Sequence, residues 1–234
     1  MTINAEIFGS TIVAVGSFNP AIFSPDWFEK NKLIGPQDAD VARQFPNLLV
    51  SRQVASFEIE WFGVQVLENR FTLTSKGAVT PAFRDLALGI FTILSQTPVA
   101  GLGLNFEGHY KVKSLDDYLK IGDVFAPKNI WNEIFPPEAY DCGLANLTIQ
   151  VRYAPRGKTP ETKDQANITL APSALVTQGI SWAYNDHHEI NDDKDRNMTS
   201  AECAVEIIEK QWESSCEKSI RVFEHLIEAA VHAS

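Results

Sequence analysis

The sequence lacks the features of a membrane-spanning or secreted protein. No stretch approaches the roughly 20 consecutive apolar residues that a transmembrane helix needs, and the first residues do not combine a basic region with an apolar core, so we expect no secretion signal. The three cysteines are Cys142, Cys203 and Cys216. The last two would lie about 20 Å apart on one predicted helix, too far to form a disulfide. We therefore expect a cytoplasmic protein with free thiols.

Positive charge is scarce as well. The chain has 20 Lys and Arg residues against 30 Asp and Glu residues, which gives a net charge of −10. Residues 185–234 hold twelve of the acidic residues and only five basic ones, and no run of Lys or Arg occurs elsewhere. An acidic surface repels phosphate groups. We therefore expect neither nucleic acid nor a membrane as a partner.

Motifs for catalysis and for cofactor binding are also missing. The sequence has no G-x-S-x-G nucleophile elbow and no P-loop. Gly101 and Gly103 begin a pattern like that of dinucleotide-binding proteins, but Phe106 stands where the third glycine belongs. We therefore expect no cofactor, and the sequence favours a protein that is not an enzyme.

The strongest chemical signal lies in residues 181–200, where Asp186 precedes the adjacent histidines His187 and His188. Neighbouring residues of a strand point to opposite faces, so these two histidines cannot converge on one ion. His109, on a different predicted strand, is the only plausible further metal ligand from a distant part of the chain. We expect no metal site. Asp186 is placed to orient an imidazole for acid–base chemistry, so Asp186, His187, His188 and His109 are the candidate catalytic residues.

Hydrophobic periodicity predicts an α+β protein. Residues 55–61 alternate between apolar and polar, which is typical of an antiparallel strand with one solvated face. The predicted elements follow the order β-α-β-β-β-α twice, with a join near Pro98. We therefore predict two halves, residues 1–98 and 99–234, that form one curved, mainly antiparallel sheet covered by helices.

A short helix is predicted over residues 25–33. Ser24 is a good N-cap and Pro25 suits the first helical position, while Gly35 favours the end of a helix. The chain between Gly35 and residue 55 carries no predicted element.

The clearest element is a helix over about residues 200–232. Thr199 and Glu202 form a capping box, and apolar residues recur along one stripe at helical spacing. Such a helix spans about 50 Å, which exceeds the width of a compact half. We therefore expect it to cross both halves or to dock on a second chain. The expected interface residues are aromatic or apolar, the groups that usually anchor interfaces: Trp182, Tyr184, Trp212, Phe223 and Ile227.

Three phrases carry a resemblance to known sequences. They are "VGSFNPAIFSPDWF" (residues 15–28), "GLGLNFEGHY" (residues 101–110) and "W-x-Y-N-D-H-H-E" (residues 182–189). In these phrases the chain resembles a sporadically distributed family of bacterial proteins of unassigned function. The resemblance implies a bacterial accessory protein that works beside a partner, and it implies no catalytic residue.

Two functions follow from the sequence. The first is a cytoplasmic, non-catalytic binding or assembly protein that acts through protein–protein contacts, as a homo-oligomer or as an accessory subunit. The alternative is a small-molecule-binding or hydrolytic enzyme with a histidine-containing site in a cleft between the two halves.

Overall fold

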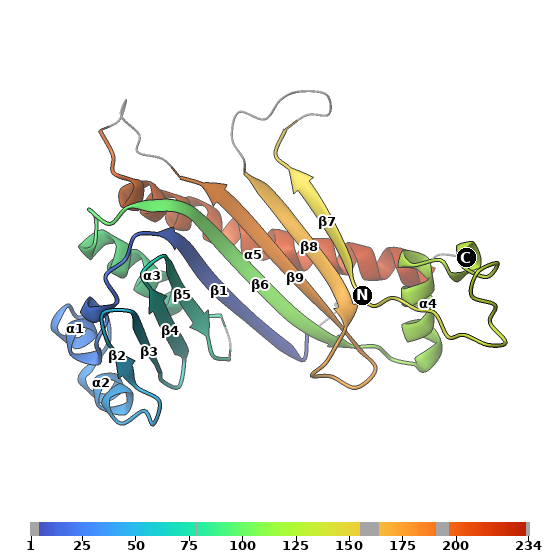
Figure 1. Ribbon diagram of the computed structural model, residues 1–234, viewed down its shortest axis with the longest axis horizontal. Helices are drawn as coiled ribbons and strands as arrows, with labels where there is room; N and C mark the ends of the chain where they lie inside the picture. Colours follow the sequence, from blue (N-terminus) through green and yellow to red (C-terminus); the bar gives the residue numbers. More distant parts are fainter. Residues whose placement is uncertain (1–4, 78, 155–163, 191–196, 233–234) are drawn as a thin grey trace.

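The computed structural model describes residues 5–77, 79–154, 164–190 and 197–232, with side chains as far as Ala230 (Figure 1). The strands are β1 (Ile7–Gly16), β2 (Leu49–Val50), β3 (Val54–Glu58), β4 (Phe62–Leu67), β5 (Arg70–Ser75), β6 (Val99–Lys111), β7 (Leu147–Arg152), β8 (Gln165–Pro172) and β9 (Gly179–Glu189). The helices are α1 (Pro25–Lys30), α2 (Pro36–Arg43), α3 (Pro81–Ile93), α4 (Leu115–Phe125) and α5 (Ser200–His232), with 3-10 turns η1 (Pro20–Ile22) and η2 (Lys128–Ile130).

Within these residues the strands form one open antiparallel sheet in the order β2-β3-β4-β5-β1-β6-β9-β8-β7. The first strands of the two halves, β1 and β6, pair in the middle of the sheet. From this centre outward, β5, β4 and β3 follow β1, while β9, β8 and β7 follow β6. The predicted α+β class and the single antiparallel sheet covered by helices are confirmed. The second half follows the predicted order β-α-β-β-β-α, whereas the first half contains helix α2 and strand β2 in addition.

The hydrophobic core lies between one face of the sheet and the helices (Figure 1). Phe28 of α1 packs edge-on against Phe57 of β3, and Trp212 of α5 packs against Phe106 of β6. Side chains on the other face alternate with the core residues and are mostly half-buried or exposed. The sheet therefore presents one face to the core and leaves the other largely uncovered, as the alternation in the sequence predicted.

Helix α2 was not predicted, because Gly35 indicated the end of a helix. Gly35 is instead the N-cap of α2, and Pro36 is its first residue. Arg43, in the last turn of α2, forms ion pairs with Asp26 and Glu29 of α1. The two short helices thus pack as a pair beside β3 (Figure 1).

Helix α5 begins with the predicted capping box. The backbone N–H of Thr199 donates to Glu202 Oε2 at 2.8 Å, and the N–H of Glu202 donates to Thr199 Oγ1 at 3.3 Å. Trp212 packs against Phe83 of α3, which belongs to the first half, whereas Phe223 packs against Trp182 of the second half. The helix therefore crosses both halves.

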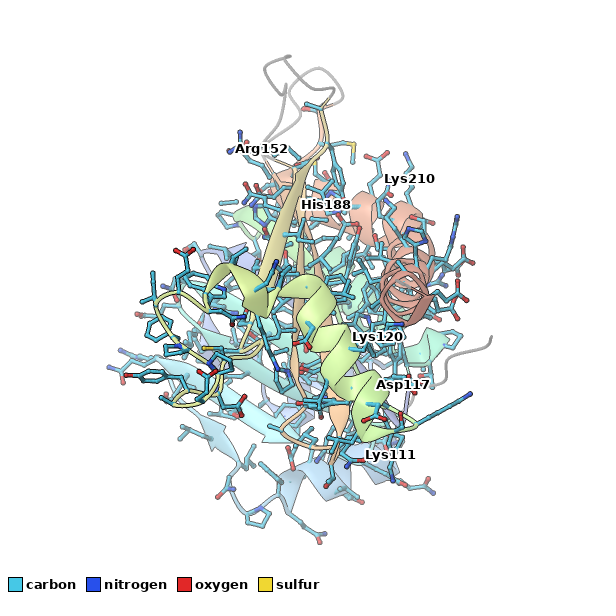
Figure 2. The ribbon with its side chains drawn as sticks, turned by 90° about the vertical axis from the view of Figure 1, so that its right-hand side faces the viewer. Lys111, Asp117, Lys120, Arg152, His188 and Lys210 are labelled. Atoms are coloured by element: carbon cyan, nitrogen blue, oxygen red, sulfur yellow. The ribbon has the colours of Figure 1, made fainter. Side chains whose placement is uncertain are left out.

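Of the two expected arrangements of α5, the structure shows the one in which the helix crosses both halves. Buried side chains continue along its whole described length, from Ala201 through Ser215 and Ser219 to Ala230. The helix runs behind the sheet past the long strands β6 and β9, and its last turns lie near α4 (Figures 1 and 2). The length of α5 is therefore no reason to expect a second chain.

Candidate functional site

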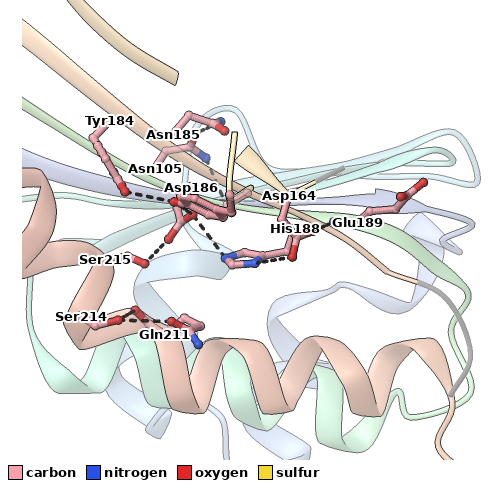
Figure 3. A network of polar contacts seen from close by, with 12 residues as sticks. Asn105, Asp164, Tyr184, Asn185, Asp186, His188, Glu189, Gln211, Ser214 and Ser215 are labelled. Carbon is pink, nitrogen blue, oxygen red and sulfur yellow. Dashed lines mark hydrogen bonds and ion pairs between the residues drawn. The ribbon is translucent and has the colours of Figure 1, made fainter. Parts of the chain in front are cut away.

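Asp186 lies at the centre of a buried polar cluster between the sheet and α5 (Figure 3). The alternation of β9 directs Asp186 and His188 toward the helices, and Asp186 is only 2% exposed. The hydroxyl of Tyr153 donates to Asp186 Oδ1 at 2.5 Å, and the hydroxyl of Ser215 on α5 donates to Oδ2. The cluster therefore joins the chain at the end of β7 to β9 and α5.

The imidazole of His188 lies between two carboxylates. Its Nε2 is 3.6 Å from Asp186 Oδ1, and its Nδ1 is 3.8 Å from Asp164 Oδ2. Asp164 in turn accepts the backbone N–H of Glu189 at 2.8 Å. Both imidazole contacts are longer than a hydrogen bond, so they act mainly by electrostatic attraction when the ring is charged.

The charged form of Asp186 is favoured despite burial. Burial disfavours the carboxylate, but His188, Ser215 and Tyr153 together outweigh burial and hold its pKa below the ordinary value. Burial, with the bond to Asp186, raises the pKa of the Tyr153 hydroxyl, so that this group stays a donor.

The order of these groups does not suit nucleophilic catalysis. In a catalytic triad the imidazole stands between the nucleophile and the acid, whereas here Asp186 stands between Ser215 and His188. Ser215 is also fully buried. We interpret the cluster as a structural link that fixes α5 on the sheet.

The other two candidate histidines lie on the opposite face of the sheet. His187 points away from His188, as the alternation predicted. His109 is buried at the far end of β6, where its Nδ1 lies 2.8 Å from Ser173 Oγ and its Nε2 lies 3.4 Å from Glu107. His109 pairs with Ser181, six residues from His187, so the two histidines are about 20 Å apart.

A hollow crosses the junction of the two halves, and its lining from β1, β5, β6 and β9 includes His109 but neither His187 nor His188. Because β1 and β6 pair along Ile7–Gly16, the sheet is continuous where the halves meet. Within the described part of the chain, no three His, Cys, Asp or Glu side chains are grouped so that they could hold a metal ion. The four candidate catalytic residues therefore form two separate sets, on opposite faces of the sheet.

The expected interface residues need a correction. All five are at most 4% exposed and pack in the core of the chain itself: Trp182, Tyr184, Trp212, Phe223 and Ile227. The ring of Trp182 stacks on that of Phe223 at 4.1 Å between centroids. Their aromatic or apolar character reflects packing between β9 and α5, and they are not available to a partner.

Exposed apolar side chains gather instead in residues 115–140, which we call the apolar arm. The arm comprises α4, η2 and the turns that follow, at one end of the molecule (Figure 2). Ile130 is 65% exposed and Ile134 is 67% exposed. The whole set of large exposed apolar residues in the arm is Leu115, Leu119, Val124, Ile130, Trp131, Ile134, Phe135 and Tyr140.

The arm is ordered enough to offer a shaped surface. Phe135 and Tyr140 contact edge to face at 5.5 Å between ring centroids, and Lys128 pairs with Asp123. Trp131 and Phe135 line a hollow together with the chain that leads to β7. The segment "PKNIWNEIFPPEAY" carried a signal in the sequence, because large apolar residues recur there without helical or strand periodicity.

Strand β7 follows the arm in sequence and forms one edge of the sheet. Its side chains alternate strictly. Ile149, Val151 and the following Tyr153 lie on the helix side and are about two-fifths exposed, at 38%, 41% and 41%. Thr148 and Gln150 lie on the uncovered face. The arm and β7 together give this end of the molecule its apolar surface.

No described helix has the length and apolarity that crossing a membrane requires. The resemblance to a bacterial family stays a prediction. Comparison with models of protein families and with curated proteins finds no match for this chain.

Proposed function

We propose that this protein is a cytoplasmic, non-catalytic binding or assembly protein that acts through protein–protein contacts and forms a homo-oligomer. The observation that carries the proposal is the apolar arm, continued by β7. Eleven of the twenty large apolar residues that are exposed in the described chain lie between Leu115 and Tyr153. Clustered apolar surface of this kind marks sites of contact with other proteins.

The composition of the arm supports a protein partner. Trp131, Phe135 and Tyr140 are of the residue types that anchor interfaces, because a large rigid ring buries much area at little entropic cost. The acidic surface of the last fifty residues does not suit nucleic acid or an anionic membrane. An accessory role in a bacterial system fits the same surface.

A charged substitution in the arm tests the proposal. We expect the double variant Ile130→Asp/Ile134→Asp to weaken self-association roughly tenfold or more, because about 1.4 kcal/mol of lost apolar contact already has that effect. Both side chains are largely exposed, so the fold should be unchanged. Light scattering after size-exclusion chromatography gives the mass, and the melting temperature confirms folding.

Val41→Asp is the matched control, because Val41 is 54% exposed on α2, at the opposite end of the molecule. The control should associate like the unaltered protein. If both variants associated equally well, the arm would not be the contact surface, and a mass of 26.0 kDa for the unaltered protein at every concentration would contradict self-association.

A further inference from the structure

We infer that the second copy binds through β7, edge to edge, so that the sheets of two chains join into one antiparallel sheet across a two-fold axis near Gln150. The inference rests on the proposed function and deepens it, since it identifies the partner strand and its direction. It starts from the outer edge of β7, which has no described strand beside it.

The free backbone groups of this edge can be identified. The N–H of Tyr153 donates to Asp164 O at 3.3 Å, on the side of β8. In an antiparallel pair, successive residues direct their N–H and C=O groups alternately to one side and the other. Ile149 and Val151 therefore bond β8, whereas Thr148 and Gln150 direct both backbone groups outward. Arg152 directs its N–H outward, but its C=O already accepts the N–H of Ala154 at 2.8 Å.

This edge carries none of the usual protection against pairing. Proteins shield exposed edges with Lys, Pro, bulges or very short strands. The other edge of the sheet follows this rule, because β2 consists of only Leu49 and Val50. Strand β7 has six residues, "LTIQVR", with regular pairing to β8 and a single charge at its end. A strand of this kind is suited to pair with another strand.

The pattern of β7 is self-complementary. In an antiparallel pair across a two-fold axis, the residues whose backbone groups point outward pair with the same set of residues in the second copy. The residues between them carry the apolar side chains, so apolar side chains also lie opposite apolar side chains. An axis at Gln150 sets Ile149 opposite Val151 of the second copy and Leu147 opposite Tyr153. Arg152 then faces Thr148, so no like charges meet.

Gln150 also ends a row of uncharged polar side chains that crosses the uncovered face. Residues directly opposite each other in the pairing are Thr74, Thr11, Asn105, Asn185, Asn167 and Gln150. The amide of Gln150 donates to Asn167 at 3.4 Å, and that of Asn105 donates to Thr11 O at 2.9 Å. Pairing at Gln150 continues this row into the second copy.

A second copy suits this edge better than an unrelated strand. In the two-fold arrangement, the apolar side chains of one β7 lie opposite those of the other, and no like charges meet. The assembly also closes after two chains. The apolar arm leads into the start of β7 at Leu147, whereas Arg152 is at the other end of the strand (Figure 1), so the contact extends beyond the strands on the Leu147 side. A two-stranded contact alone is marginal in water, and the arm supplies further apolar area.

Gln150→Pro tests the inference. Proline removes the outward N–H of Gln150 but none of the bonds to β8, and proline is tolerated on an edge strand when its nitrogen faces solvent. We expect this variant to fold with an unchanged circular dichroism spectrum and to be monomeric by light scattering. Gln150→Ala is the control, because it keeps the N–H, and it should remain a dimer.

Disulfide formation reports the register. In a Cys142→Ser background, Gln150→Cys should form a covalent dimer with oxidised glutathione, because paired Cα atoms about 5.5 Å apart suit a disulfide. Thr148→Cys should not, since the two cysteines would be more than about 10 Å apart. A dimer that survives Gln150→Pro but not Ile130→Asp/Ile134→Asp overturns pairing through β7 and leaves the proposed function standing. Equal cross-linking at both positions also overturns it.

Discussion

Replacing Gly108 with alanine is expected to lower the free energy of unfolding by about 3 kcal/mol, the upper range for overpacking a core. Gly108 of β6 lies directly opposite Trp182 of β9. A Cβ atom at this position would lie 1.7 Å from Cη2 of the indole ring and 1.9 Å from Cζ3. The ring cannot move away easily, because its other face stacks on Phe223 of α5. Glycine is thus required for β9 and α5 to pack together.

Urea denaturation measures the effect, with Gly9→Ala as the control. Gly9 lies in β1, and a Cβ atom there meets only Ser75 Oγ, at 3.7 Å. The control should change stability by less than about 0.5 kcal/mol. In a Trp182→Ala background, Gly108→Ala should lose most of its effect, since the clash is gone. A similar loss in both backgrounds would show that the ring is not the cause.

Replacing Asp186 with alanine is expected to cost about 3 kcal/mol, the lower range for removing one partner of a buried charged group. The change leaves the hydroxyls of Tyr153 and Ser215 and the ring of His188 without their common partner in the core. Each buried donor without an acceptor adds to the loss. Because the cluster joins α5 to the sheet, we also expect faster hydrogen exchange in the middle of α5.

The contribution of Asp186 depends on pH in a defined direction. Its pKa in the folded protein is lower than in the unfolded chain, so its stabilisation is complete above about pH 4, the ordinary value. The stabilisation is lost as pH falls through the lower, folded pKa. The groups that face it are His188, Tyr153, Tyr184 and Ser215.

Acid titration of the free energy of unfolding checks this direction. Asp186→Asn cannot ionise, so its difference from the unaltered protein should be largest above about pH 4 and should shrink at lower pH. Glu60→Gln, at an exposed position, is the control and should leave the profile unchanged. A difference that stays constant down to about pH 2 would contradict the lowered pKa.

Local sequence signals predicted most of the fold. Thr199 and Glu202 define the start of α5 because a capping box depends only on residues near each other in the chain. The alternation in β9 also placed His187 and His188 on opposite faces. Helix α2 was missed because Gly35 is compatible with both the end of one helix and the start of the next.

Long-range packing explains what the sequence did not predict. Trp182 and Phe223 are far apart in the chain, and only the sheet register and the path of α5 bring their rings into contact. Without that contact, both residues resemble interface anchors. Conversely, the exposure of Ile130 and Ile134 depends on where the arm lies relative to the core, which periodicity does not determine.

Amide hydrogen exchange at two protein concentrations tests most directly whether this end of the molecule binds a second copy. We expect peptides that cover residues 126–153, but not those from β3 and β4, to exchange more slowly in concentrated than in dilute protein. Equal exchange of residues 126–153 at both concentrations, with the protein monomeric in each, would contradict self-association through the apolar arm and β7.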